Sequence, residues 1–476
     1  MSIMNFSTTT DLLPHQIDAV AKLLPTRVGG LFAEMGTGKS RILIEIAKLR
    51  AAKGKVSRVV WFCPTSIKST IVFEILRHTD CIPDDIHAFD DTTRSDTVPL
   101  DRFWYVVGIE GLGQSARIVA AFDKFLDDRA FVVVDESSYI KGPRAKRTQL
   151  VTHMSARARY RMAMTGTPLT QGVVDLYAQM YFLSPKILGY NSFYSFAANH
   201  LEYRVDRRTG KRTGQIVQAH NTHVLAKKVA PYVYQITKDE CLDLPEKLFH
   251  CHGTTATAQQ REYYEAAKNE FLDIEPDDVK DFDVFRLFST LQAVSAGYHK
   301  GERLDSYRIA GLCDVLRTIR APEKVVVWTK YRLALEDIRT ALAAEYGEDA
   351  VQIFHGGLSA QEKDDNLAMW RASGRFLLAT QASGGHGLTL VDANTAVFFA
   401  NSFKFSERAQ AEDRIHRIGQ RRPCTYVDIV SNLGIDSRIG GALSNKEGTL
   451  QSFRDKLDLY RKLGLKAKIR EAVMAL

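Results

Sequence analysis

The sequence of 476 residues has few cysteines and no long apolar run. Its cysteines lack the dense, even spacing of a disulfide-stapled secreted domain and stand at Cys63, Cys81, Cys241, Cys251, Cys313 and Cys424. No run of apolar residues is long enough to span a membrane, and the first residues show no basic stretch followed by an apolar one. We therefore expect a soluble, intracellular protein with reduced thiols.

One cluster of metal-ligand residue types raises the alternative of a zinc site. Cys241 is followed by His250, Cys251 and His252. Their spacing matches no common zinc finger, and three adjacent ligands do not easily surround a tetrahedral ion. Zinc binding is the less favoured interpretation of this cluster.

The composition is that of an ordinary globular protein without a strong charge bias. Hydrophobic residues make up 45% and charged residues 25% of the chain, which suits two or three domains. Lys and Arg number 64 against 56 Asp and Glu, a formal net charge of +8. This excess is compatible with a polyanionic partner such as nucleic acid, although many soluble enzymes carry as much.

Short apolar runs rich in Val, Ile, Phe and Trp alternate with longer segments of helical periodicity, a pattern that predicts parallel sheets. The near-continuous hydrophobicity of the runs is typical of strands buried on both faces, as in a doubly wound α/β sheet. The runs are residues 29–35, 58–64, 103–109, 131–136 and 160–167, and then 324–330, 351–356, 375–382, 395–401 and 425–430. The same architecture is therefore predicted twice.

The segments around these two series predict the domain organisation. Residues 172–320 lack such runs and have helical periodicity, which predicts a helical insertion and linker between an N-terminal lobe at 1–171 and a C-terminal lobe at 321–445. Residues 446–476 alternate Leu and Phe with Lys and Arg, and predict a terminal helix that braces the second sheet.

A basic segment at residues 204–214 interrupts the helical insertion. Its cations crowd around a Thr-Gly turn signal and are Arg204, Arg207, Arg208, Lys211 and Arg212. A solvated hairpin tip and a prong that grips phosphates are both consistent with this pattern.

The most informative segment is AEMGTGKS at residues 33–40, between a predicted strand and a predicted helix. Gly36 and Gly38, with Thr37 between them, allow a tight turn whose amides point at phosphate oxygens, next to a helix N-terminus that favours negative charge. This context predicts a phosphate-binding loop.

The end of this loop carries side chains suited to a nucleoside triphosphate. Lys39 supplies a point charge for the β- and γ-phosphates, and the hydroxyl of Ser40 is placed to coordinate Mg²⁺. Ala33 stands where the usual pattern has glycine. We expect ATP and Mg²⁺ as the ligands.

An acidic pair, Asp135 and Glu136, ends the predicted strand at 131–136, where a parallel sheet presents its ligand-facing edge. Asp135 can hold Mg²⁺ through water, and Glu136 can polarise an attacking water molecule. Together with the phosphate loop, the pair predicts nucleotide hydrolysis.

From here the sequence resembles the superfamily-two helicases, and among them the Swi/Snf-type translocases, over most of its length. LLPHQ at residues 12–16 is similar to the opening motif of the family, and the resemblance implies that Gln16 contacts adenine. DESS at 135–138 matches the acidic box, and TGTP at 165–168 matches the motif that relays the state of ATP to the DNA-binding surface.

The second half of the chain carries the other family motifs. TQASGGHGLTL at 380–390 is similar to the glycine-rich motif that contacts DNA and nucleotide, with Gly387 implied in nucleotide binding. QAEDRIHRIGQ at 410–420 closely matches the Swi/Snf signature. The resemblance implies that Gln410 contacts the nucleotide and that Arg414 and Arg417 are arginine fingers, which stabilise charge on the γ-phosphate during transfer.

The resemblance implies two RecA-like lobes in tandem that together form an ATP-dependent motor on double-stranded DNA. Such a motor binds the phosphate backbone with little sequence specificity. We expect a monomer, in the cytoplasm of a bacterium or phage-infected cell, or in the nucleus if the source is eukaryotic. Candidate DNA contacts, chosen by neighbourhood and charge, are Lys68, Arg332, Lys404 and residues 204–212.

The sequence departs from the family pattern at two places, and two alternative functions stay open. Ser138 replaces the usual histidine, and the segment after Pro64 lacks the expected tryptophan. The nearer alternative is a motor that separates or anneals strands of DNA or RNA. The further one is an ATP-gated clamp or recruitment factor that binds DNA without continuous turnover.

Overall fold

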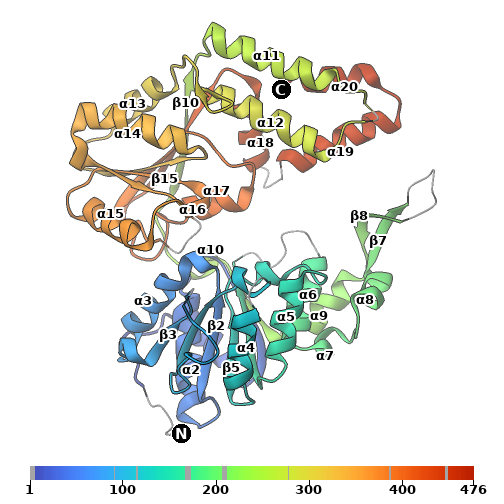
Figure 1. Ribbon diagram of the computed structural model, residues 1–476, viewed down its shortest axis with the longest axis vertical. Helices are drawn as coiled ribbons and strands as arrows, with labels where there is room; N and C mark the ends of the chain where they lie inside the picture. The colour runs from blue at the N-terminus through green and yellow to red at the C-terminus, as the bar shows by residue number, and fades with distance from the viewer. Residues whose placement is uncertain are drawn as a thin grey trace. The chain divides into compact units, whose positions relative to one another are not determined.

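The computed structural model describes residues 6–90, 92–113, 116–166, 173–205, 212–276, 278–384, 388–444 and 449–476. The chain divides into two compact units, Met1–Asp243 and Leu244–Leu476 (Figure 1). Each unit is built around one large parallel sheet with helices on both faces. The predicted architecture of two α/β lobes in tandem is confirmed.

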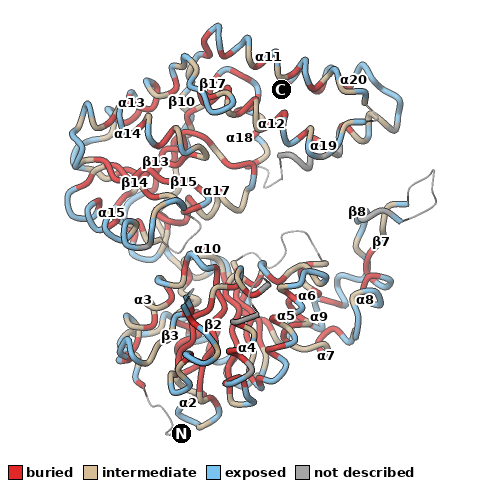
Figure 2. The backbone as a smooth tube through the Cα atoms, in the orientation of Figure 1, coloured by how far each residue is buried: buried red, intermediate tan, exposed pale blue. Residues whose placement is uncertain are grey.

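The sheet of the first unit has seven parallel strands in the order β3-β4-β2-β5-β6-β1-β9. Strands β2 and β5, near its centre, are buried along their whole length (Figure 2). The strands are β1 (Val28–Ala33), β2 (Arg58–Cys63), β3 (Ile86–Ala88), β4 (Trp104–Gly108), β5 (Ala130–Val134), β6 (Tyr160–Thr165) and β9 (Val233–Ile236).

Helices cover both faces of this sheet. The apolar core on one face includes α1 (Pro14–Leu23), α2 (Lys39–Ala52) and α3 (Lys68–His78). The core on the other face includes α4 (Ala116–Phe125), α5 (Lys146–Ser155), α6 (Val173–Leu183), α7 (Pro185–Leu188), α8 (Phe193–His200) and α9 (Thr222–Val229). The short helix α10 (Lys238–Cys241) follows β9.

An antiparallel hairpin stands beside α8 (Figure 1). It consists of β7 (Leu201–Val205) and β8 (Arg212–Ala219), which carry the two ends of the basic segment predicted from the sequence. Residues 206–211 of that segment lie outside the described residues.

The sheet of the second unit has six parallel strands in the order β10-β17-β16-β13-β15-β14. The strands are β10 (Lys247–Thr254), β13 (Lys324–Thr329), β14 (Val351–Phe354), β15 (Phe376–Thr380), β16 (Ala393–Phe398) and β17 (Cys424–Ser431). Helices α13 (Arg308–Thr318) and α14 (Arg332–Tyr346) pack on one face. On the other face lie α15 (Ala360–Ala372) and α17 (Phe405–Glu412), while α16 (Gln381–Gly384) follows β15.

The stretch 172–320 differs from the helical insertion predicted for it. It contains β9, which pairs with β1 at the edge of the first sheet, and β10, which pairs with β17 over eight residues at the edge of the second. It also contains the β7–β8 hairpin and a two-residue antiparallel pair, β11 (Tyr298–His299) with β12 (Glu302–Arg303). Most of the predicted insertion thus belongs to one or other of the two units.

The C-terminal segment also differs from the single helix predicted to pack on the second sheet. It forms α19 (Thr449–Lys462) and α20 (Lys466–Met474), with Gly464 between them at a φ of 66°, a conformation that ends a helix. Both helices share an apolar core with α11 (Ala258–Leu272), α12 (Asp281–Ser295) and α18 (Gly434–Ser444). The segment therefore completes a helical layer.

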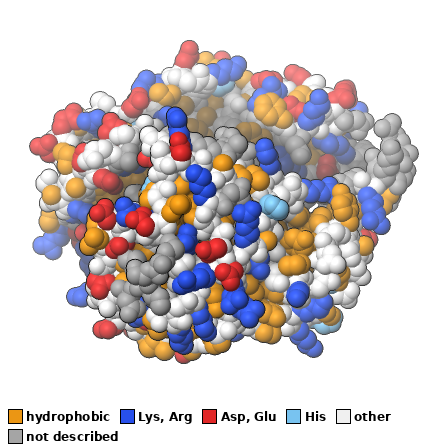
Figure 3. All heavy atoms as spheres, turned by 60° about the horizontal axis from the view of Figure 1, so that its bottom comes forward, with side chains coloured by type: hydrophobic (Ala, Val, Ile, Leu, Met, Phe, Trp, Pro, Cys, Tyr) orange, Lys and Arg blue, Asp and Glu red, His pale blue; other side chains and the backbone are white. Residues whose placement is uncertain are grey.

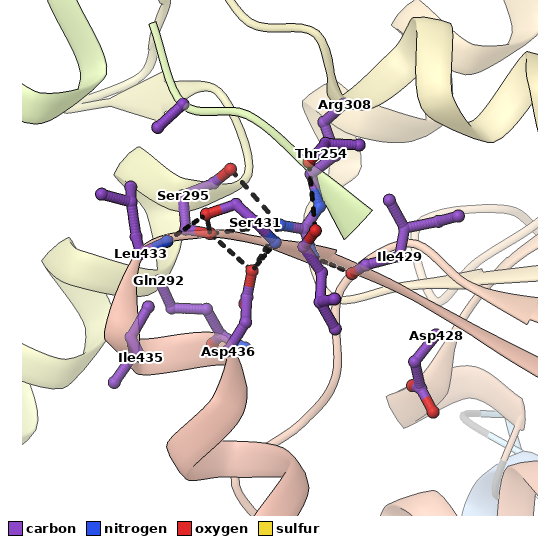
Figure 4. A network of polar contacts seen from close by, with 12 residues as sticks. Thr254, Gln292, Ser295, Arg308, Asp428, Ile429, Ser431, Leu433, Ile435 and Asp436 are labelled. Carbon is purple, nitrogen blue, oxygen red and sulfur yellow. Dashed lines mark hydrogen bonds and ion pairs between the residues drawn. The ribbon is translucent and has the colours of Figure 1, made fainter. Parts of the chain in front are cut away.

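A buried polar network fastens this helical layer to the second sheet (Figure 4). The guanidinium of Arg308 on α13 forms an ion pair of 2.6 Å with Asp436 on α18 and donates to the carbonyl of Ile429 on β17. Asp436 also accepts from the hydroxyl of Ser295 on α12 at 2.7 Å and from the backbone amide of Ser431 at 2.8 Å. Since each charged group has several partners, these contacts offset the free-energy cost of burying the charges.

Among the described residues, no helix is both long enough and apolar enough to cross a membrane.

Candidate nucleotide-binding site

The predicted phosphate loop joins β1 to α2 at the carboxyl edge of the first sheet. Gly36 and Gly38 have φ angles of 82° and 84°, in the left-handed region that side chains avoid. A Cβ atom at Gly38 would also lie 2.2 Å from the side-chain nitrogen of Gln16. Both glycines are therefore required by the turn, and helix α2 begins directly after it with Lys39.

Helix α1 holds this loop through two side chains. The Nε2 atom of Gln16 donates to the carbonyl of Thr37 at 3.1 Å, and a ring nitrogen of His15 lies 2.8 Å from the same oxygen. Gln16 also caps its own helix, because its Oε1 accepts from the amide of Leu13 at 2.9 Å. With only 4% of its surface exposed, Gln16 is a structural link between α1 and the loop.

The side chain of Lys39 folds back onto the first residues of the loop. The ammonium of Lys39 donates to the carbonyl of Ala33 at 2.9 Å and to that of Glu34 at 3.4 Å. Ser40 follows on the same helix and is half-buried. The loop amides, Lys39 and the α2 N-terminus provide a setting that fits a polyphosphate.

Strand β9 and the residues after it support the loop from the other side. The amide of Glu34 donates to the carbonyl of Ile236, and its carboxylate accepts from the amide of Lys238 at 2.8 Å. The hydroxyl of Tyr234 donates to the carbonyl of His15 at 3.0 Å. These supports were not predicted from the sequence, in which the short run VYQI at 233–236 is their signal.

The acidic pair lies at the same sheet edge, because β5, β6 and β1 are neighbours. Asp135 is buried, and burial together with the charge of Glu136 raises the pKa of its carboxyl to about 7. A divalent cation beside such a carboxyl favours its charged form. The magnesium-holding role of Asp135 stays a prediction.

The end of β6 bridges the acidic pair and the phosphate loop. Its last residue, Thr165, donates through its hydroxyl to the carboxylate of Glu136 at 3.3 Å. A Cβ atom on the next residue, Gly166, would lie 3.3 Å from the amide of Met35 in the phosphate loop. Glu136 itself has a φ of 50°, which is unusual for a residue with a side chain and is a strain typical of functional sites.

This bridge gives a contact between the acidic box and the relay motif that does not involve position 138. Ser138 is half-buried, and its carbonyl accepts from the amide of Lys141. The neighbouring Ser137 is buried and donates to Gln179 on α6 at 2.6 Å. Thr167 and Pro168, the rest of the relay motif, lie outside the described residues.

The second unit distinguishes between the two predicted arginine fingers. Both guanidinium groups donate to the carbonyl of Leu388, Arg414 at 3.4 Å and Arg417 at 3.1 Å. Arg414 is only 3% exposed, whereas Arg417 is half-buried. Gln410 is half-buried on α17, and Gly387 lies outside the described residues.

Other residues of the Swi/Snf-like signature have structural roles. The side-chain nitrogen of Gln420 donates to the carbonyls of Ala393 at 2.9 Å and Ile415 at 3.1 Å. Its side-chain oxygen accepts from the backbone amides of residues 421 and 422. A ring nitrogen of His416 lies 2.8 Å from the carbonyl of Pro245. These contacts fix the backbone that carries Arg414 and Arg417.

The side chains predicted to contact DNA differ in whether they are exposed or already paired within the protein. Lys68 donates to the carbonyl of Phe89, and Lys404 forms an exposed ion pair of 2.8 Å with Glu407. Arg332 and Arg212 are exposed. On the face shown in Figure 3, basic and acidic side chains are intermixed, so the surface charge there does not itself mark a DNA track.

The cluster considered as a zinc site has no metal-binding geometry among the described residues. No three His, Cys, Asp or Glu side chains in them stand close enough to hold a metal ion. His250, Cys251 and His252 are consecutive on β10, so their side chains alternate between the two faces of the sheet.

Comparison with known families agrees with this geometry. Residues 15–296 match the SNF2-related domain, and residues 307–419 match the helicase conserved C-terminal domain. The chain thus has the two domains of a helicase-like ATPase of superfamily two. It belongs to the SNF2-related family, whose domain covers more than half of its length.

Individual relatives are distant. The chain is 25% identical over 332 residues to the putative ATP-dependent helicase/translocase YwqA of Bacillus subtilis, a match covering 66% of this chain and 34% of that protein. It is 22% identical over 478 residues to the SWI/SNF-related matrix-associated actin-dependent regulator of chromatin subfamily A-like protein 1 homolog of Caenorhabditis elegans, covering 97% and 64% respectively. The chain spans less than two thirds of either relative.

The Sulfolobus solfataricus SWI2/SNF2 ATPase core in complex with dsDNA aligns with a TM-score of 0.45 at 21% identity, over 99% of this chain and 97% of that one.

Proposed function

We propose that this protein hydrolyses ATP to move along double-stranded DNA, with little dependence on base sequence. The observation that carries the proposal is the bridge at the edge of the first sheet. Thr165 touches the carboxylate of Glu136 while Gly166 packs against the phosphate loop at Met35. A change at the phosphates can therefore be passed to the residues that follow β6.

Each side chain of the site has a role in this proposal. The loop amides and Lys39 bind the phosphates, while Ser40 and Asp135 are the residues that would hold Mg²⁺, which when bound supplies positive charge against the phosphate oxygens. Glu136 accepts a proton from the attacking water molecule.

In this proposal Arg414 and Arg417 act as arginine fingers on the γ-phosphate of ATP. Arginine is suited to this role because its planar guanidinium donates two parallel hydrogen bonds to phosphate oxygens. The fixed backbone around Gln420 supports the assignment, since a preorganised cation stabilises the transition state without reorganisation at the moment of reaction.

ATP hydrolysis is the direct test of the nucleic-acid substrate. We expect duplex DNA to raise the hydrolysis rate of the purified protein by about tenfold or more, a usual size for coupling between two sites. Single-stranded DNA and duplex RNA should stimulate less, and added salt should weaken the effect steeply because DNA binding releases counterions.

Two other results would favour a different function for the protein. Equal or greater stimulation by single-stranded DNA or by RNA would favour a strand-separating or annealing motor. Slow hydrolysis that no nucleic acid changes would contradict the motor and favour an ATP-gated clamp. Lys39→Ala serves as the inactive control throughout.

A further inference from the structure

A second concave surface lies on the first unit, apart from the nucleotide site. It is a hollow of about 610 Å³ between residues 142–145, helix α8 and the β7–β8 hairpin. A neighbouring hollow of about 490 Å³ lies between α5 and the α6–α8 region. Because Pro143 and Phe193 line both, the two hollows adjoin, and we call them together the α8 groove.

The described walls of the α8 groove carry positive charge and no carboxylate. Arg144 and Arg212 line the first hollow, and Arg161 and His153 line the second. Among the residues that the structure describes, no Asp or Glu lines either hollow, although Asp and Glu are common in this chain. The groove is therefore complementary to an anionic partner.

An exposed aromatic ring stands at the first hollow. Tyr194 on α8 is 71% exposed, and the guanidinium of Arg144 lies 5.0 Å from the centre of its ring. Phe193 lines both hollows and is also within 6.0 Å of Arg144. An open tyrosine ring beside arginines is the arrangement on which proteins stack nucleic-acid bases.

The second hollow holds polar groups that lack a partner within the described part of the chain. The hydroxyl of Thr148, in a residue only 4% exposed, has no hydrogen-bond partner there, and neither has the Nε of Arg161. Burial lowers the pKa of the Arg161 guanidinium, as expected where no carboxylate compensates it. The guanidinium of Arg161 therefore adds to the positive charge of the wall of this hollow.

We propose that the α8 groove binds an unpaired nucleic-acid strand, with a base stacked on Tyr194 and phosphates on Arg144, Arg161 and Arg212. A single strand is favoured over a duplex because the bases of a duplex are already stacked on one another and cannot present a face to the tyrosine ring. This strand-binding function goes beyond movement along a duplex and does not depend on ATP hydrolysis.

The test measures binding of a short fluorescent oligothymidylate to the full chain without ATP. A saturating excess of unlabelled blunt duplex DNA keeps duplex-binding surfaces occupied. We expect Tyr194→Ala to weaken binding of the probe at least about fivefold, the lower end for loss of one stacked base. Tyr194→Phe, which keeps the ring, should bind as the unchanged protein does.

Two further variants separate stacking from phosphate contact. Arg212→Ala should lower the slope of log affinity against log salt by about one, as expected for loss of one phosphate contact. Tyr307→Ala, which removes another exposed tyrosine from the second unit, is the matched control and should leave binding unchanged. Because Tyr194 is highly exposed, its replacement should not impair folding.

Several outcomes would overturn the proposal. One is that the protein does not bind oligothymidylate. Another is that Tyr194→Ala binds it as tightly as the unchanged protein does. A third is that an oligoglutamate binds as tightly as the oligothymidylate probe. The duplex-stimulated ATPase of Tyr194→Ala is expected to stay intact. A different result separates the two proposals. If Tyr194→Ala loses strand binding and duplex DNA does not stimulate the ATPase of the unchanged protein, strand binding by the α8 groove is supported and the proposed motor function is contradicted.

Discussion

Replacing Glu136 with Gln is expected to lower kcat for ATP hydrolysis by about 10²- to 10⁴-fold, the range for loss of a general base. The amide keeps the shape of the side chain but cannot take a proton from water. Because the phosphate loop and Lys39 are separate from position 136, ATP binding should persist. Steady-state hydrolysis and equilibrium binding of a fluorescent ATP analogue measure the two effects independently.

Two controls make this result specific. Lys39→Ala should lose binding and hydrolysis together, since it removes the cation of the phosphate loop. Glu74→Gln removes a carboxylate from helix α3, where it contacts His78, and should leave both near those of the unchanged protein. A Glu136→Gln protein that keeps at least a third of the normal kcat would exclude Glu136 as the base.

Replacing Arg417 with Ala is expected to lower kcat by about 10³-fold or more, the effect of losing an arginine finger. Arg417→Lys should recover little of this, because an ammonium cannot reproduce the two parallel bonds of a guanidinium. Since Arg417 is only half-buried, its loss should leave the melting temperature within a few degrees of normal.

Arg414→Ala should lower kcat and stability together. Its buried guanidinium contacts the carbonyl of Leu388, so truncation leaves a gap in the second unit as well as removing a charge. Arg421→Ala, an exposed arginine four residues beyond Arg417, is the matched control and should change neither quantity. Full activity of Arg417→Ala would show that the finger lies elsewhere.

The interior of both sheets could be predicted from the sequence. Each of the ten apolar runs coincides with a strand, because strands buried on both faces need continuous apolar residues. Of the edge strands, β14 was predicted by its apolar run, whereas β3, β9 and β10 were not. β10 is held by eight-residue backbone pairing with β17 while none of its residues is buried, so it leaves no hydrophobic run in the sequence.

The nucleotide site was predictable where its residues are close in sequence. The run from Gly36 to Ser40 is such a case. The contact between Glu136 and Thr165 could not be predicted. It depends on β6 lying next to β5 in the sheet, and the sequence of neither strand determines that order. The contrast between Arg414 and Arg417 likewise depends on burial in the folded unit, since both occur in one signature motif.

The central claim, that ATP hydrolysis drives movement along duplex DNA, is tested most directly by displacement of a third strand from a triplex on blunt linear DNA. We predict displacement that requires ATP, occurs without separation of the duplex strands, and is lost in Glu136→Gln. Duplex-stimulated hydrolysis without displacement of the third strand would contradict translocation.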